Sequence, residues 1–315
     1  MRPIPRKTLM LTALWLSAAA AAPAQSYTFQ TFHVPYPPRN NTYVQAMNNR
    51  GAIVGYMDFS HRIHGYLGVA DRGFKLDADG VFEYPIIDPN DGIFVTVPTG
   101  INDYGVIVGH YGDAQGVYHG FILNNGAFTT VDVNGGPNTW VSGINDSGDF
   151  VGEYGTDPLY PENGFVSRGG VISTIAVPGT VATRPFAIAT DGTVVGVASY
   201  ADHDSVFVMG PKSNISTFRI AGAVIQIPYA INNEVHLIAG TYTDASHGYH
   251  GFTYDYLSQA AQNAPDGATV TVNTIDYPGE TEMTLNAVNA NGTIAGSAIT
   301  QASGHFFGFI GTPAP

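Results

Sequence analysis

One short pattern returns six times along this 315-residue chain, and it constrains the fold more than any other feature. It consists of an apolar residue, Asn, two further residues, Gly, and an apolar run that ends in a second Gly, or a degenerate form of that order. Successive copies start 54, 43, 44, 43 and 57 residues apart. Such a period is typical of a repeat architecture, in which each unit packs against its neighbours. The copies read MNNRGAIVG from Met47, INDYGVIVG from Ile101, INDSGDFVG from Ile144, IATDGTVVG from Ile188, INNEVHLIAG from Ile231 and VNANGTIAG from Val288.

Each unit holds four short strand signals separated by Gly, Asn and Asp turns. The first two flank the Asn-x-x-Gly step, the third begins with HGF or a variant, and the fourth carries Thr at a fixed place, with Tyr84 there in the first unit. Four strands in a period of this length match one blade of a β-propeller. The third segments begin at His64, His119, Asn163, Ser205, His250 and Phe307, and the Thr positions are Thr130, Thr174, Thr217 and Thr274.

The two ends of the chain complement each other. The sixth unit stops after its third strand, whereas residues 26–36 carry the pattern of a fourth strand, with Thr31 at the Thr position. Pairing them closes the ring and removes exposed sheet edges. We therefore predict an all-β fold, a six-bladed β-propeller with four antiparallel strands per blade and the last blade closed by the N-terminal strand. The predicted blades cover approximately residues 44–95, 96–138, 139–181, 182–224, 225–281, and 282–311 with 26–36.

The first 24 residues have the features of a cleavable export signal. Two arginines and a lysine precede the apolar run TLMLTALWLSAAAAA, and an A-x-A cleavage pattern ends at Ala24. The apolar run is shorter than the roughly 20 residues that span a bilayer. We predict a signal peptide over residues 1–24 and a single propeller domain over residues 25–315, located in the periplasm or outside the cell.

Charge and composition limit the partners. Removal of the leader takes away three basic residues and no acidic one, so the formal charge changes from −13 to −16. Nucleic acids and anionic membranes attract basic surfaces, so neither is an expected partner. A saccharide, another small molecule or a protein is compatible with this surface, and a monomer is expected. The chain has no cysteine, which excludes disulfides and thiolate chemistry.

The units, with GIN, G, IVG and then HGF, resemble the HAF-repeat family of extracellular proteins. The resemblance covers essentially the whole chain after the leader, but the fourth unit departs from the pattern, with IATDG and SVF. The resemblance implies export and a repeat fold, and it implies no agreed activity.

The repeated polar residues are expected to be structural. Asn, Asp and Gly in the Asn-x-x-Gly step form a tight turn between the first two strands of a blade. A histidine repeated in one register lies in a different blade each time, so we expect a repeated side-chain hydrogen bond, packed by the aromatic residue that follows, and not one shared metal. These residues are Asn48, Asn102, Asn145, Asn232 and Asn289, and His64, His119 and His250.

Residues that break the repeat are better candidates for function. Loops between blades and loops between the second and third strands share one face, where propellers usually bind. Histidines and acidic residues gather in these loops and can act as general bases or hold a divalent cation, although no specific metal or nucleophile motif is present. A solvated polar loop is the alternative interpretation. The candidate catalytic residues are His110, Asp113, His203, Asp204, His247 and Asp244.

Candidate ligand-binding residues lie at the same face. Trp140 is the one Trp outside the leader, and Tyr43 takes the equivalent position in the first blade. An aromatic ring near a propeller mouth suits a sugar or an aromatic ligand, and ordinary packing between blades is the alternative. Arg184 and His61 complete this set.

Two functions remain open. The first is a secreted propeller that binds or scaffolds a saccharide, small ligand or protein partner. The second is an exported hydrolase or lyase, acting on a polysaccharide, ester or lactone with His, Asp or Tyr residues of the loop face and a divalent cation as candidate cofactor. The fold alone does not decide between them, since propellers host both.

Overall fold

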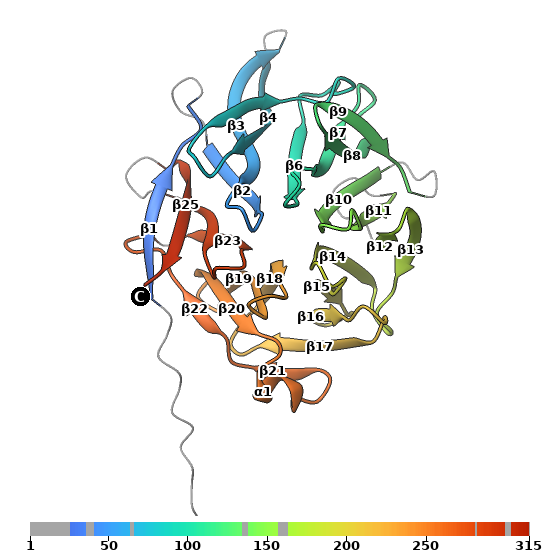
Figure 1. Ribbon diagram of the computed structural model, residues 1–315, viewed down its shortest axis with the longest axis vertical. Coiled ribbons are helices and arrows are strands. Elements are labelled where there is room, and N and C mark those ends of the chain that lie inside the picture. The colour runs from blue at the N-terminus through green and yellow to red at the C-terminus, as the bar shows by residue number, and fades with distance from the viewer. Residues whose placement is uncertain are drawn as a thin grey trace, which may run out of the picture.

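The computed structural model describes residues 26–35, 41–63, 66–133, 138–156, 163–280, 282–299 and 304–314, except for the side chains of 59–63 and 66–69. Six antiparallel sheets stand around a central axis like the blades of a propeller (Figure 1). The predicted fold class is confirmed. In the described part of the chain, the helical structure is limited to α1 (Gln259–Gln262), and no helix is long or apolar enough to cross a bilayer.

The strands of each blade follow one another outward from the axis. The first blade has β2 (Asn41–Met47), β3 (Ile53–Ile63), β4 (Tyr66–Leu76) and β5 (Phe82–Ile86); the second has β6 (Thr96–Ile101), β7 (Ile107–Gly112), β8 (Tyr118–Asn124) and β9 (Ala127–Val131); the third has β10 (Asn138–Ile144), β11 (Phe150–Gly155), β12 (Asn163–Arg168) and β13 (Val171–Ile175). The fourth has β14 (Ala182–Ile188), β15 (Val194–Ser199), β16 (Asp204–Met209) and β17 (Ile215–Ile220); the fifth has β18 (Ile225–Asn232), β19 (Leu237–Thr243), β20 (Tyr249–Asp255) and β22 (Asn273–Ile275); the sixth has β23 (Met283–Val288), β24 (Ile294–Ile299), β25 (Phe306–Pro313) and β1 (Tyr27–Phe32).

The ends of the chain share the sixth blade, as predicted. Strand β1 pairs antiparallel with β25, from Tyr27 opposite Pro313 to Phe32 opposite Gly308. The Phe32 ring covers Gly308 so closely that a Cβ on this glycine would lie 2.4 Å from it. Closure therefore depends on side-chain packing as well as on backbone hydrogen bonds.

The core lies between adjacent blades and repeats with them. One Phe on the third strand of every blade is fully buried, and it faces the second Gly of the repeated pattern. A Cβ on Gly109, for example, would lie 2.1 Å from the carbonyl oxygen of Val97 and 2.7 Å from the Phe121 ring. Only glycine permits this approach. The six rings belong to Phe74, Phe121, Phe165, Phe207, Phe252 and Phe309.

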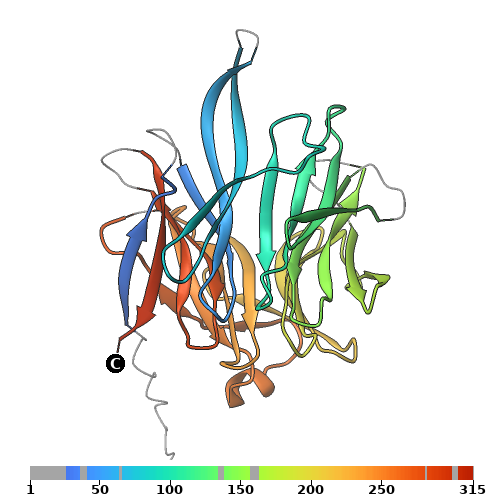
Figure 2. The same cartoon turned by 45° about the horizontal axis from the view of Figure 1, so that its top comes forward.

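This register corrects the alignment of the first blade. Phe74 is opposite Gly55, just as Phe121 is opposite Gly109, so Arg72-Gly73-Phe74 takes the place of His-Gly-Phe. The HGYL segment, whose His64 lies outside the described residues, is therefore not the equivalent of the later HGF steps. The sequence suggested the wrong segment because β3 and β4 are each 11 residues long, which places HGYL near the tip of their hairpin and Phe74 further along β4. Figure 2 shows this hairpin projecting beyond the other blades. This hairpin, together with the longer connection from β5 to β6, accounts for the first long interval between repeats.

The second long interval is an insertion in the fifth blade. Between β20 and β22 the chain forms α1 and then β21 (Ala268–Val270), which pairs parallel with β17 of the fourth blade. The insertion therefore covers the outer edge of a neighbouring sheet.

The repeated asparagines form turns, as predicted, and also link blades. The Oδ1 atom of Asn102 accepts hydrogen bonds from the backbone N–H groups of Tyr104 and Val106, at 3.1 and 3.0 Å. Its Nδ2 donates to the carbonyl oxygen of Asn145 in the next blade, at 3.1 Å. Asn48 and Asn145 bond to the following blade in the same way. These turns therefore join the hairpins at one end of the ring.

A shift in register interrupts every innermost strand where it pairs with the second strand. The residue at the shift is skipped by the pairing, for example Ser142 between Val141 and Gly143. Side chains at the shifts line the spaces along the axis. They are Gln45, Thr99, Ser142, Phe186, Tyr229 and Asn286.

Candidate functional site

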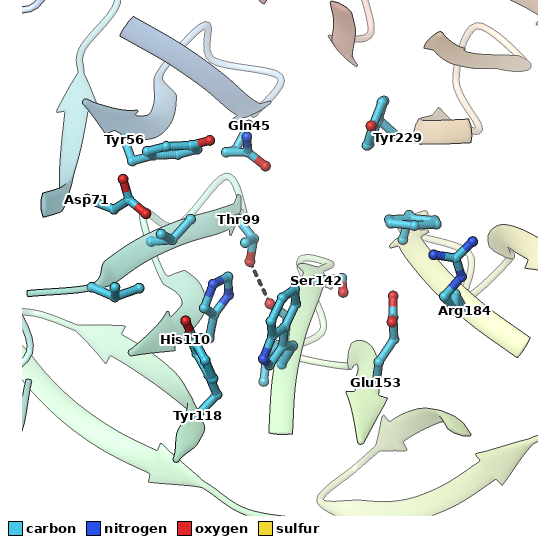
Figure 3. Close-up of a pocket in the computed structure, with 15 residues that line it drawn as sticks. Gln45, Tyr56, Asp71, Thr99, His110, Tyr118, Ser142, Glu153, Arg184 and Tyr229 are labelled. Carbon is cyan, nitrogen blue, oxygen red and sulfur yellow. Dashed lines mark hydrogen bonds between the residues drawn. The ribbon is translucent and has the colours of Figure 1, made fainter. Parts of the chain in front are cut away.

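A cavity of about 370 Å³ lies at one mouth of the central channel. Innermost strands begin and second strands end at this mouth, so it belongs to the face with the loops between blades. Figure 3 shows its polar side chains arranged around an open centre. Its lining comes from the first four blades and from Tyr229 of the fifth.

Cross-strand pairs on the two inner strands of each blade surround this mouth. In the fifth and sixth blades the second members are small, and their hydroxyls accept hydrogen bonds from the next blade: Thr241 from Leu285 N at 2.9 Å and Ser297 from Val44 N at 2.8 Å. In the first four blades, at least one member is large or charged, so the cavity lies on their side. The pairs are Tyr43 with Tyr56, Val97 with His110, Trp140 with Glu153, Arg184 with Val197, Ile227 with Thr241 and Thr284 with Ser297.

One wall of the cavity is aromatic. His110 and Trp140 stack with ring centroids 4.6 Å apart and an angle of 8° between their planes. Tyr118 packs against both rings, at 5.9 and 5.4 Å. Burial lowers the pKa of His110 to about 4, so its imidazole is neutral at pH 7.

This wall contains two buried polar atoms with no hydrogen-bond partner among the described residues. They are Nδ1 of His110 and Nε1 of Trp140. Buried polar groups in native proteins are nearly always paired, because an unpaired one costs about 1–3 kcal/mol. Neither nitrogen is exposed to the cavity, so a bound molecule would reach them only after the rings moved.

The adjoining wall holds Glu153, Arg184 and Tyr229, which Figure 3 shows on the same side of the cavity. Glu153 is only 5% exposed. Burial raises its pKa to about 8 although the nearby Arg184 charge opposes this, so the carboxyl is protonated at pH 7. Burial also raises the pKa of Tyr229 to about 12. This wall therefore presents a cation and two neutral hydroxyl donors.

A second carboxyl lies near Tyr56, away from Arg184 (Figure 3). Burial, followed by the charge of Asp58, raises the pKa of Asp71 to about 6, while Arg72 opposes the shift. Asp71 is consequently ionised at pH 7. The cavity has an acidic end and a basic end.

Three of the predicted site residues line this cavity: His110, Trp140 and Arg184. Tyr43 lies behind Tyr56, stacked on it at 4.7 Å, and is not part of the lining. The side chain of His61 lies outside the described residues.

The other predicted candidates are spread around the rim. Asp113 and Asp244 each accept backbone N–H groups within their own loop, for example Val117 N at 2.9 Å on Asp113. His203 stacks on Tyr200 and contacts Asp202 at 2.7 Å. Neither Asp204 nor His247 is among the residues that line the cavity.

Sequence reasoning missed Glu153, Asp71 and Tyr229. Glu153 has a signal in the sequence, because it follows the second Gly of its repeat just as His110 does. The other two had none, since Asp71 depends on the corrected register of β4 and Tyr229 on the shift in β18.

The repeated histidines have structural partners, as expected. His119 contacts Asp132 at 2.8 Å and Asp113 at 3.3 Å, and it stacks on Tyr111 of the adjacent strand, not on the residue that follows it. Burial lowers the pKa of His119, but the two carboxylates outweigh this and raise it. His250 repeats the arrangement in the fifth blade with Asp276, Asp244 and Tyr242.

The described residues contain no evident set of ligands for a metal ion. Among them, no three His, Asp or Glu side chains gather closely enough to hold an ion. The divalent cation stays a prediction.

Comparison with known proteins supports the fold. No protein-family model and no curated protein matches the sequence, so the HAF-repeat resemblance is not confirmed. The structure is similar to TolB from Acinetobacter baumannii, with a TM-score of 0.53 and 11% identity over 84% of this chain and 64% of the TolB chain. At this identity the likeness extends to the propeller fold alone.

Two lyase structures also match, with lower TM-scores. Streptogramin B lyase has a TM-score of 0.44 and 13% identity, over 91% of this chain and 89% of its own. A catalytically inactive virginiamycin B lyase from Staphylococcus aureus with quinupristin has a TM-score of 0.45 and 10% identity, over 92% and 100%.

Proposed function

We propose that this protein is an exported β-propeller that binds a small ring-containing ligand in the cavity at the mouth of its channel. The observation that carries the proposal is the stacked pair of His110 and Trp140 rings, with Tyr118 packed against them, in the lining of one cavity. A ring-shaped ligand would pack against this aromatic surface. Export rests on the leader over residues 1–24.

The size and lining of the cavity favour a ligand of one or two rings. Its volume of about 370 Å³ falls in the usual range for small-molecule sites. Aromatic side chains offer flat apolar surfaces to a sugar or an aromatic ring, and the polar groups around them fix its orientation. A saccharide and an aromatic small molecule are therefore the first classes to test.

The test uses the exported, processed protein, in which Trp140 is the one tryptophan. A panel of mono- and disaccharides and aromatic compounds is titrated while Trp140 emission is followed, and hits are measured by calorimetry. We expect at least one compound to bind, and Trp140→Phe to weaken it about tenfold or more with little change in Tm. Tyr104→Phe, at a residue that is 72% exposed on an inner-hairpin turn at the opposite end of the ring, is the matched control. A panel without binders at millimolar concentration, or a Trp140→Phe protein that binds normally, contradicts the proposal.

A second candidate function is a hydrolase or lyase, and a specific observation favours it. A neutral imidazole and a protonated carboxyl, His110 and Glu153, line the same cavity at pH 7, and such shifted groups suit acid–base chemistry. Ester, lactone and polysaccharide substrates would be assayed with and without Mg²⁺ or Zn²⁺. Turnover that His110→Asn abolishes while binding persists supports catalysis; equal turnover in that variant argues against it.

A further inference from the structure

Arg184 is a cation without a counter-ion in the described part of the chain. It lies on β14 next to the central axis, and the residue opposite it on β15 is Val197, which offers no charge. The described residues provide no ion pair or hydrogen bond to its guanidinium group. Arg184 is half-buried in the wall of the cavity.

Glu153 is the acidic residue whose pKa the charge of Arg184 affects, but it does not neutralise Arg184. The two groups influence each other electrostatically, but they form no ion pair within 4 Å, and burial keeps the carboxyl protonated at pH 7. The Tyr229 hydroxyl is also neutral. This side of the cavity therefore carries a net positive charge and is surrounded by hydrogen-bond donors.

A partly desolvated guanidinium group is most stable when an anion pairs with it. Its planar fork matches a carboxylate, with two parallel N–H···O bonds. The protonated Glu153 and the Tyr229 hydroxyl can each donate a further hydrogen bond to an oxyanion, whereas an ionised Glu153 would repel it.

We propose that the ligand is a small ring-containing carboxylic acid, whose carboxylate pairs with Arg184 while its ring packs against the Trp140 and His110 wall. This inference rests on the binding function proposed above and names its ligand class. Asp71, at the acidic end, repels the carboxylate and accepts hydrogen bonds from hydroxyl groups. The cavity consequently has a negative charge at one end and a positive charge at the other. This arrangement orients a hydroxylated acid, either a uronic acid or a hydroxylated aromatic acid.

Matched pairs of probes test the inference. D-Glucuronate is compared with D-glucose, and 4-hydroxybenzoate with 4-hydroxybenzamide, by calorimetry on the processed protein at pH 7. We expect the acid of at least one pair to bind ten times or more as tightly as its neutral partner, and which pair responds separates the sugar source from the aromatic one. Arg184→Met should reduce the affinity for the acid to that of the neutral compound. Arg219→Met, at an exposed position on the outer strand β17, should leave it unchanged.

The outcomes separate this inference from the binding function itself. Neutral partners that bind as tightly as the acids, with no loss in Arg184→Met, overturn the carboxylate assignment and leave the binding function standing. Absence of binding by all four probes overturns the carboxylate assignment, and absence of binding across the wider panel as well overturns both. Arg184→Lys distinguishes charge from geometry, because a lysine retains the charge without the fork; recovery of less than half of the binding free energy lost in Arg184→Met supports a bidentate pair.

Discussion

The imidazole of His110 lies parallel to the indole of Trp140, 4.6 Å away between ring centroids. Burial lowers the pKa of this histidine to about 4, so the stack holds a neutral ring throughout the physiological range. A protonated imidazole quenches indole emission more strongly than a neutral one does. We therefore expect the histidine-dependent fall in Trp140 emission, the part that His110→Gln removes, to occur near pH 4.

The measurement is a fluorescence titration of the processed protein, with His110→Gln as the control that lacks the transition. Circular dichroism over the same range separates protonation from unfolding. A transition near pH 6.5, the ordinary value for histidine, would show that the imidazole is accessible to water and would remove the buried stack from the site.

Glu153 should make the protein less stable as the pH rises. Its pKa is about 8 in the folded protein and about 4.5 in the unfolded chain, so the folded state binds the additional proton between these values. Stability therefore falls from about pH 4.5 to about pH 8, because stability rises with pH only where the unfolded state binds more protons. Glu153→Gln imitates the neutral acid and should be stabilised relative to the original protein at pH 8, by on the order of a few kcal/mol.

Denaturant unfolding at pH 5 and pH 8 checks this expectation. The difference between the two proteins should be small at pH 5 and large at pH 8. Glu234→Gln, on the exposed turn between β18 and β19, serves as the matched control. An equal difference at both pH values would mean that Glu153 is ionised in the folded protein.

The sequence was sufficient for the propeller because the same residues recur for the same physical reason in every blade. Gly109 and Phe121 illustrate this, since the close contact between them occurs in all six units. The split blade followed from the missing strand at one end of the chain and the additional strand at the other. Repetition thus predicts what is common to the blades.

The site could be predicted only in part because it consists of what differs between blades. His110, Trp140 and Arg184 stood out as departures from the repeat, but the raised pKa of Glu153 depends on burial that no local pattern encodes. Pairs that are neighbours in the sequence, such as Asp244 and His247, belong to a loop turn, because each loop keeps its own place on the rim. Proximity along the chain was a poor guide to proximity at the channel mouth.

Asn102→Ala should destabilise the ring without changing the cavity. The substitution removes two hydrogen bonds within the turn and the one to Asn145 in the next blade, and it leaves buried backbone groups unpaired. We expect a loss on the order of 1–3 kcal/mol in the free energy of unfolding. Asn124→Ala, at the exposed end of β8, is the control and should change little. Equal stability of the two variants would argue that the links between hairpins contribute nothing.

Gly308→Ala should weaken the closure of the ring. A Cβ at this position would lie 2.4–2.8 Å from atoms of the Phe32 ring, and real contacts of this kind do not occur, so the ring must move from the seam between β1 and β25. Overpacking of this kind costs on the order of 1–3 kcal/mol. A double-mutant cycle identifies the cause, since in a Phe32→Ala background the added methyl group has space and the same substitution should cost much less. If Gly308→Ala costs equally in both backgrounds, the glycine is required for its backbone and not for the packing of the N-terminal strand.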